Sequence, residues 1–91
     1  MTQFSVEYEP SVIKALSRMD RGSAAFIYSW IDSHLVGCEN PRRWGKPLFY
    51  DRKGSWRYRI GDFRLIATIK DRELVILLIE VGNRKDVYCK K

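Results

Sequence analysis

The chain has 91 residues, which is enough for one compact core, so we expect a single domain over residues 1–91. With 45% hydrophobic residues, the chain is too apolar for a disordered protein. It has no run of about 18 apolar residues that would span a membrane, and its N-terminus lacks the pattern of a secretory signal, which predicts a cytoplasmic protein. The net charge of +6 comes from residues 42–91, which carry fourteen basic and six acidic side chains; this favours a polyanionic partner, although a solubilising surface explains the composition equally well.

The first 46 residues predict one strand, two helices and a loop. Residues 4–8 alternate apolar and polar side chains, as in a strand with one buried face, and Pro10 ends this strand. We expect Ser23 to cap the second helix and Gly37 to close it, whereas the breakers and charges of residues 37–46 indicate a loop. The two helices are indicated by apolar stripes with helical spacing, at Val12, Ile13, Leu16 and Met19 and then at Ile27, Trp30, Ile31 and Leu35.

The second half changes to the period of two that is typical of strands. Residues 55–60 and 63–70 alternate around Gly61-Asp62, a pair that favours a type II′ hairpin turn, and a second turn at 71–72 leads to an apolar strand over 74–81. The sequence therefore predicts an α+β fold with an N-terminal strand, two tandem helices, and an antiparallel meander of strands with both helices packed on one face of the sheet. The core under the helices should include Trp56, Tyr58, Ile60, Phe63, Leu65 and Ile76.

A two-residue turn at 61–62 brings arginines together on the other face of the sheet. Arg59 then stands directly opposite Arg64, and Arg57 lies on the same face. Like charges opposed on neighbouring strands cost up to about 1 kcal/mol, so we infer a compensating gain, a cationic cleft that binds a phosphodiester. An ordinary solvent-exposed sheet face has the same alternation and stays the alternative.

The next hairpin extends this arrangement. If Lys70 pairs with Glu73, Arg64 lies opposite Ile79. Ile79 is near the end of its strand, so Arg84, which follows shortly after, would lie at the edge of the same cationic cleft. That pairing also puts an apolar strip on the arginine face, which we expect a partner protein to cover. The strip consists of Ile66, Leu77 and Ile79.

The sequence resembles the RelE branch of the RelE/ParE superfamily of bacterial toxins in three motifs: Gly-Lys-Pro-Leu at 45–48, Gly-Ser-Trp-Arg-Tyr-Arg-Ile-Gly-Asp-Phe-Arg-Leu-Ile at 54–66, and Val-Gly-Asn-Arg-Lys-Asp-Val-Tyr at 81–88. The resemblance implies the toxin of a type II toxin–antitoxin system. Such a toxin enters the A site of the 70S ribosome, among ribosomal RNA, and cuts the mRNA by attack of a ribose 2′-hydroxyl on the adjacent phosphate. It also implies a cognate antitoxin that holds the toxin inactive in a hetero-oligomer, and no membrane partner.

The resemblance further implies which residues act. The implied catalytic residues are Arg59, Arg64, Arg84 and Tyr88, and the implied RNA-binding residues are Lys46, Lys53, Arg57 and Asn83. Arginine stays protonated at working pH, so the arginines would bind and polarise the phosphate. Tyr88, Lys53 and Lys46 stay open as the group that moves the proton. Many relatives carry histidine or lysine where this chain has Asn83, which removes a potential titrating group.

We expect neither a metal nor another cofactor, because Cys38, Cys89 and His34 do not have the spacing of a zinc site. The main alternative function is that of a ParE-like toxin, which inhibits DNA gyrase through protein contacts on the same fold. A non-catalytic RNA-binding module is a third interpretation. It explains the charge but gives no special reason for Arg64, Arg84 and Tyr88 to converge.

Overall fold

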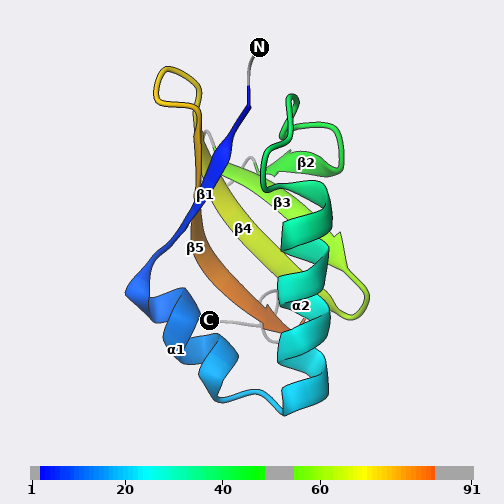
Figure 1. The fold of residues 1–91 in the computed structure, drawn as a ribbon. Helices are drawn as coiled ribbons and strands as arrows, with labels where there is room; N and C mark the ends of the chain where they lie inside the picture. Colours follow the sequence, from blue (N-terminus) through cyan, green and yellow to red (C-terminus); the bar gives the residue numbers. More distant parts are fainter. Residues whose placement is uncertain (1–2, 49–54, 84–91) are drawn as a thin grey trace.

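The computed structural model describes residues 3–48 and 55–83, which form a mixed five-stranded sheet with both helices on one face (Figure 1). The strands lie in the order β1-β5-β4-β3-β2, with β1 parallel to β5 and every other neighbouring pair antiparallel. This arrangement confirms the predicted α+β fold. In chain order the elements are β1 (Ser5–Tyr8), α1 (Pro10–Ser17), α2 (Arg21–His34), β2 (Gly45–Leu48), β3 (Ser55–Ile60), β4 (Phe63–Lys70) and β5 (Val75–Asn83).

The two helices begin at residues that suit a first turn. Pro10 opens α1, where its missing N–H costs no hydrogen bond. Asp20 caps α2, because its carboxylate accepts a hydrogen bond from the Ser23 N–H over 3.0 Å. The prediction that Ser23 is the cap was therefore wrong by three residues. At the other end Gly37 adopts a φ of +76°, which permits the chain to reverse after α2.

The β3–β4 hairpin has the predicted register. Ile60 pairs with Phe63 and Arg59 with Arg64, as a two-residue turn requires. Gly61 has a φ of +59°, whereas Asp62 has no positive φ, which fits a type II′ turn. The turn therefore sets the pairing of the whole hairpin.

Two predicted details of the strands were wrong. The loop expected over residues 37–46 ends earlier, because β2 begins at Gly45 and pairs along β3. The second hairpin has a four-residue connection over 71–74, and a register shift lies between Ile66 and Ala67. Lys70 therefore pairs with Val75 and not with Glu73, which moves the pairing by two residues, and the shift inserts one more residue into β5. Arg64 is consequently opposite Gly82 and not Ile79.

The core lies between the helices and the sheet. Tyr58, Leu65 and Ile76 are completely buried there, as the alternation predicted, and Trp56 and Phe63 pack against them partly buried. The other predicted core residue, Ile60, is 1% exposed.

The apolar strip on the opposite face is not an open surface. Ile66 is only 4% exposed, and Leu77 and Ile79 are half-buried. The strip therefore gives no reason by itself to expect a covering partner. Neither helix of the described residues has the length and the hydrophobicity needed to cross a membrane.

Candidate functional site

A pocket of about 360 Å³ is lined by residues of β2, β3 and β4 and by the two residues before β2. Among the residues that the structure describes, five of those that line it are cationic and none is acidic, so we call it the basic pocket. Its lining consists of Arg43, Trp44, Gly45, Lys46, Arg57, Arg59 and Arg64.

Strand pairing brings four of the cations together. Lys46 of β2 lies opposite Arg57 of β3, and Arg59 of β3 lies opposite Arg64 of β4. Directly paired residues project to the same side, and alternate residues of β3 share a face, so all four side chains leave the sheet on one side. The pairing of β2, β3 and β4 in the sheet therefore creates one cationic surface.

The four cations differ in burial. Arg64 is 2% exposed and Arg57 is half-buried, whereas Lys46 and Arg59 are exposed. Water screens the charge of a buried side chain less than that of an exposed one, because the effective dielectric constant around it is lower. The electric field of Arg64 in the pocket is therefore stronger than that of the exposed Lys46. Arg64 therefore forms the fixed floor of the pocket, and the exposed pair can adapt to a ligand at its rim.

The segment between α2 and β2 is anchored at two points. The Tyr58 hydroxyl, which is buried, donates a hydrogen bond of 2.6 Å to the Pro41 carbonyl. Arg42 forms a bidentate ion pair with Asp71 at 2.9 Å for both contacts, and its guanidinium lies 5.8 Å from the centre of the Trp56 ring. These contacts fix the chain immediately before the residues that enter the pocket.

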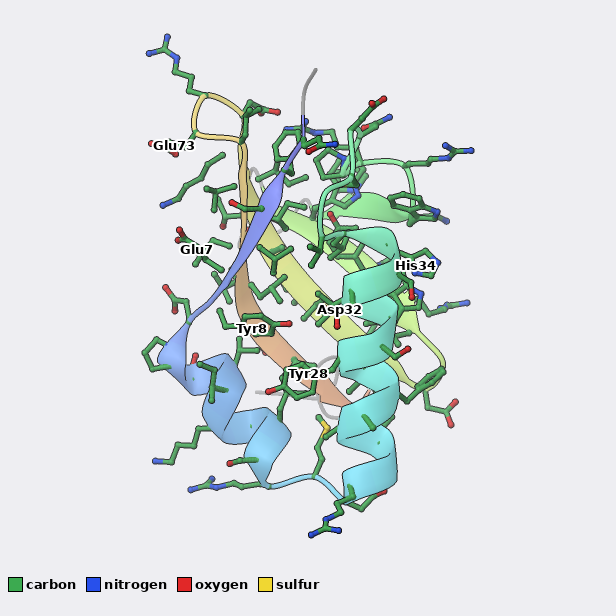
Figure 2. All side chains as sticks on the ribbon, viewed as in Figure 1. Glu7, Tyr8, Tyr28, Asp32, His34 and Glu73 are labelled. Atoms are coloured by element: carbon green, nitrogen blue, oxygen red, sulfur yellow. The ribbon has the colours of Figure 1, made fainter. Side chains whose placement is uncertain are left out.

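Trp44 forms the aromatic side of the pocket. The Arg43 guanidinium lies 5.7 Å from the centre of the Trp44 ring, and His34 meets that ring edge-on with the centroids 5.3 Å apart. His34 is itself fixed, because it stacks on Trp30 at 4.3 Å and its Nδ1–H donates a 2.9 Å hydrogen bond to the Trp30 carbonyl. Figure 2 shows His34 on the side of α2 that faces away from β1.

The predicted site residues divide into three groups. Lys46, Arg57, Arg59 and Arg64 line the basic pocket. Asn83 does not line it, because it ends β5 opposite Phe63 and shares the side of the sheet that Phe63 takes. The remaining predicted residues lie outside the described part of the chain; they are Lys53, Arg84 and Tyr88.

Sequence reasoning missed three residues of the pocket, which are Arg43, Trp44 and Gly45. They fall in the segment that the sequence predicts to be a loop, because Pro41 and the neighbouring charges interrupt any periodic pattern. The available signal was an aromatic side chain beside two arginines at the start of the basic half, a combination that favours contact with nucleic acid.

Two tyrosines in the described residues have perturbed acidity. Burial raises the pKa of Tyr58 above its usual range, with a smaller contribution from Cys38. Burial, followed by the charge of Asp32, raises the pKa of Tyr8 to about 12, and this tyrosine lies 5.8 Å from the ring of Tyr28 (Figure 2). Both tyrosines are therefore neutral structural groups at physiological pH. Across residues 3–48 and 55–83 no three His, Cys, Asp or Glu side chains are grouped as metal ligands would be.

Comparison with known proteins supplies the family. The family model described as the ParE toxin of type II toxin–antitoxin systems, parDE, matches residues 6–88. The chain belongs to this toxin family. The chain is also 28% identical to the toxin RelE of Mycobacterium tuberculosis, over 93% of its own length and 86% of that protein.

Two further proteins are similar to the chain. The toxin RelG of M. tuberculosis is 35% identical over 53% of this chain, and the match spans about half, 55%, of that relative. Among solved structures, the RelBE2 toxin–antitoxin complex of M. tuberculosis contains a chain that this toxin matches with a TM-score of 0.82 and 24% identity. The match covers 94% of this chain and 97% of the other, which shows that the two share a fold.

Proposed function

We propose that this toxin is an endoribonuclease that acts on the ribosome, cuts mRNA in the A site and needs no metal. The observation that supports this proposal is the basic pocket, a space of about 360 Å³ that five cationic side chains, and no acidic one of residues 3–48 and 55–83, surround. Opposing Arg59 to Arg64 costs stability, and a phosphodiester bound between them would offset that cost.

The proposed reaction is an internal transfer at one phosphate of the mRNA. The ribose 2′-oxygen forms a bond to phosphorus, the bond to the 5′-oxygen of the next nucleotide breaks, and a cyclic phosphate and a 5′-hydroxyl result. Negative charge builds on the non-bridging oxygens during this step. Guanidinium groups held in place before the reaction, Arg64 from the floor and Arg59 from the rim, would stabilise that charge.

The proton must leave the 2′-hydroxyl and a proton must reach the departing 5′-oxygen. Arginine is a poor carrier for either transfer because it stays protonated. Of the three candidates for this role, Lys46 lines the basic pocket, while Lys53 and Tyr88 lie outside the described residues. We assign Arg84 and Tyr88 to the catalytic group on the motifs that carry them, and Lys53 and Asn83 to RNA binding on the same ground.

The proposed partners follow from this activity. The RelBE2 structure is a toxin–antitoxin complex, which supports a cognate antitoxin and a toxin–antitoxin hetero-oligomer for this chain too. A protein that cuts mRNA on 70S ribosomes would work in the cytoplasm. The positive charge of residues 42–91 would favour contact with ribosomal RNA as well as mRNA.

The test uses purified ribosomes that carry a defined mRNA with one codon in the A site. We expect the toxin to cut at that codon, and equally in the presence of a metal chelator at a Mg²⁺ concentration that keeps the ribosome intact. Primer extension maps the ends of the products. Intact mRNA after incubation with folded toxin would overturn the proposal.

A second candidate function is inhibition of DNA gyrase, because the family model that matches the chain is named for the ParE toxin. Gyrase inhibition through protein contacts requires no cationic pocket, so the geometry favours the nuclease. A supercoiling assay separates the two functions: loss of supercoiling with uncut mRNA would favour the gyrase inhibitor.

A further inference from the structure

Trp44 is a large apolar residue that is exposed to solvent beside the basic pocket. It is 37% exposed, and among the exposed large apolar residues of the described chain it alone lines the basic pocket. The Trp44 ring contributes little to the stability of the fold, because a half-exposed apolar side chain provides only part of the free energy of full burial. Its position is therefore better explained by a ligand than by the core.

The Trp44 ring is held before any ligand arrives. His34 contacts it edge-on at 5.3 Å, and the Arg43 guanidinium lies 5.7 Å from its centre. The backbone just before it is tied down by the Tyr58 hydrogen bond to Pro41. A side chain fixed in this way loses less conformational entropy on binding than a free one.

The pocket therefore combines two kinds of recognition. The cations of β2, β3 and β4 suit a phosphate, and an aromatic ring at their edge suits the flat face of a base. Stacking of one base on an aromatic side chain is sequence-tolerant and strengthens binding by about 5- to 150-fold. A guanidinium beside the ring, here that of Arg43, adds a second planar surface and a positive charge.

We propose that Trp44 is the stacking platform for a nucleobase next to the phosphate that the basic pocket binds. This inference rests on the proposed function, because the ligand is the same RNA strand. It adds a binding residue that reads the base, whereas the arginines read the backbone. His34 is then a positioning residue, which orients the Trp44 ring without touching RNA.

The test measures binding separately from cleavage. Two fluorescent deoxyribose oligomers of equal length are compared by anisotropy: oligothymidine, and an abasic chain with the same phosphates. Neither has a 2′-hydroxyl, so neither is cut. We expect the wild-type toxin to bind oligothymidine about 5- to 150-fold more tightly than the abasic chain.

Substitutions assign that preference to the ring. Trp44→Leu should reduce the preference to less than about twofold and leave abasic binding unchanged, whereas Trp44→Phe should keep most of it, because only the latter retains a π-face. Phe26→Ala is the matched control, since Phe26 is an aromatic residue of α2 that is 51% exposed and does not line the pocket. It should bind both oligomers as the wild type does. Circular dichroism checks that each variant is folded.

Each outcome decides one proposal. Equal binding of the two oligomers by the wild type, or a preference that survives in Trp44→Leu, would overturn the stacking inference even if mRNA is cut on ribosomes. A preference for bases without any cleavage of ribosome-bound mRNA would overturn the proposed function and leave the stacking site. Failure to bind either oligomer would overturn the stacking inference, whereas the proposed function is decided by cleavage on ribosomes.

Discussion

Arg59 lies directly opposite Arg64 across the β3–β4 ladder, so two guanidinium groups leave the same face of neighbouring strands. Their environments are unequal, because Arg64 is 2% exposed and Arg59 is exposed. The two positive charges repel each other inside the basic pocket. The two residues should therefore respond differently to substitution.

Replacing Arg64 should strongly slow cleavage. Arg64→Met keeps most of the buried volume but removes the charge, and loss of one positioned group that stabilises transition-state charge typically lowers kcat by about 100- to 1000-fold. The single-turnover rate on programmed ribosomes measures the effect. Lys70→Met is the matched control, because Lys70 lies on the same face of β4, is exposed and does not line the pocket. Near wild-type cutting by folded Arg64→Met toxin would contradict the assignment.

Replacing Arg59 should trade activity for stability. Arg59→Gln removes the like-charge pair, so we expect the free energy of unfolding to rise by about 0.2–1 kcal/mol. RNA binding should weaken, and the slope of log affinity against log salt should become shallower by about 0.7 for one lost phosphate contact. Urea unfolding and salt titration of oligonucleotide binding measure the two effects. A variant that loses stability and keeps the wild-type salt slope would show that Arg59 has only a structural role.

Gly45 should not tolerate a side chain. A Cβ at this position would lie less than 3.0 Å from the Arg57 carbonyl oxygen and from Trp56 Nε1. Because the first of these is backbone, β2 would have to move, and we expect Gly45→Ala to lower the free energy of unfolding by about 1–3 kcal/mol. Gly22→Ala is the control, since its Cβ meets nothing closer than 3.4 Å in the first turn of α2. Equal thermal stability of the two variants would contradict the clash.

Tyr58 should stabilise the fold in a pH-dependent way. Tyr58→Phe removes the hydrogen bond to the buried Pro41 carbonyl, at a cost of about 1–3 kcal/mol. Burial raises the pKa of the Tyr58 phenol in the folded state, so its contribution is fully present below the unfolded pKa of about 10 and is lost as the pH rises above that value.

The measurement is the Tm of wild type and Tyr58→Phe between neutral pH and about pH 11, a range that crosses the unfolded tyrosine pKa. The difference between the two proteins should be largest at neutral pH and shrink above pH 10. Tyr8 contributes to the alkaline loss of stability in both proteins, because burial raises its pKa as well. A constant difference over the whole range would contradict the role of the phenol.

The sequence alone was sufficient for the local features of this fold. The Gly61-Asp62 turn set the pairing of Arg59 with Arg64, because two residues leave only one register for the strands beside them. Strict alternation then separated the core residues of β3 and β4 from the arginines. The three motifs likewise carried the family, which the match over residues 6–88 bears out.

Tertiary structure decided what depends on contacts between distant segments. The parallel pairing of β1 with β5, the shift between Ile66 and Ala67, and the entry of Trp44 into the basic pocket have no local pattern. Each is fixed by packing or by a long-range bond, such as that from Tyr58 to Pro41, seventeen positions apart. Periodicity reports which side of an element is buried, but only the assembled core determines which distant residues share a surface.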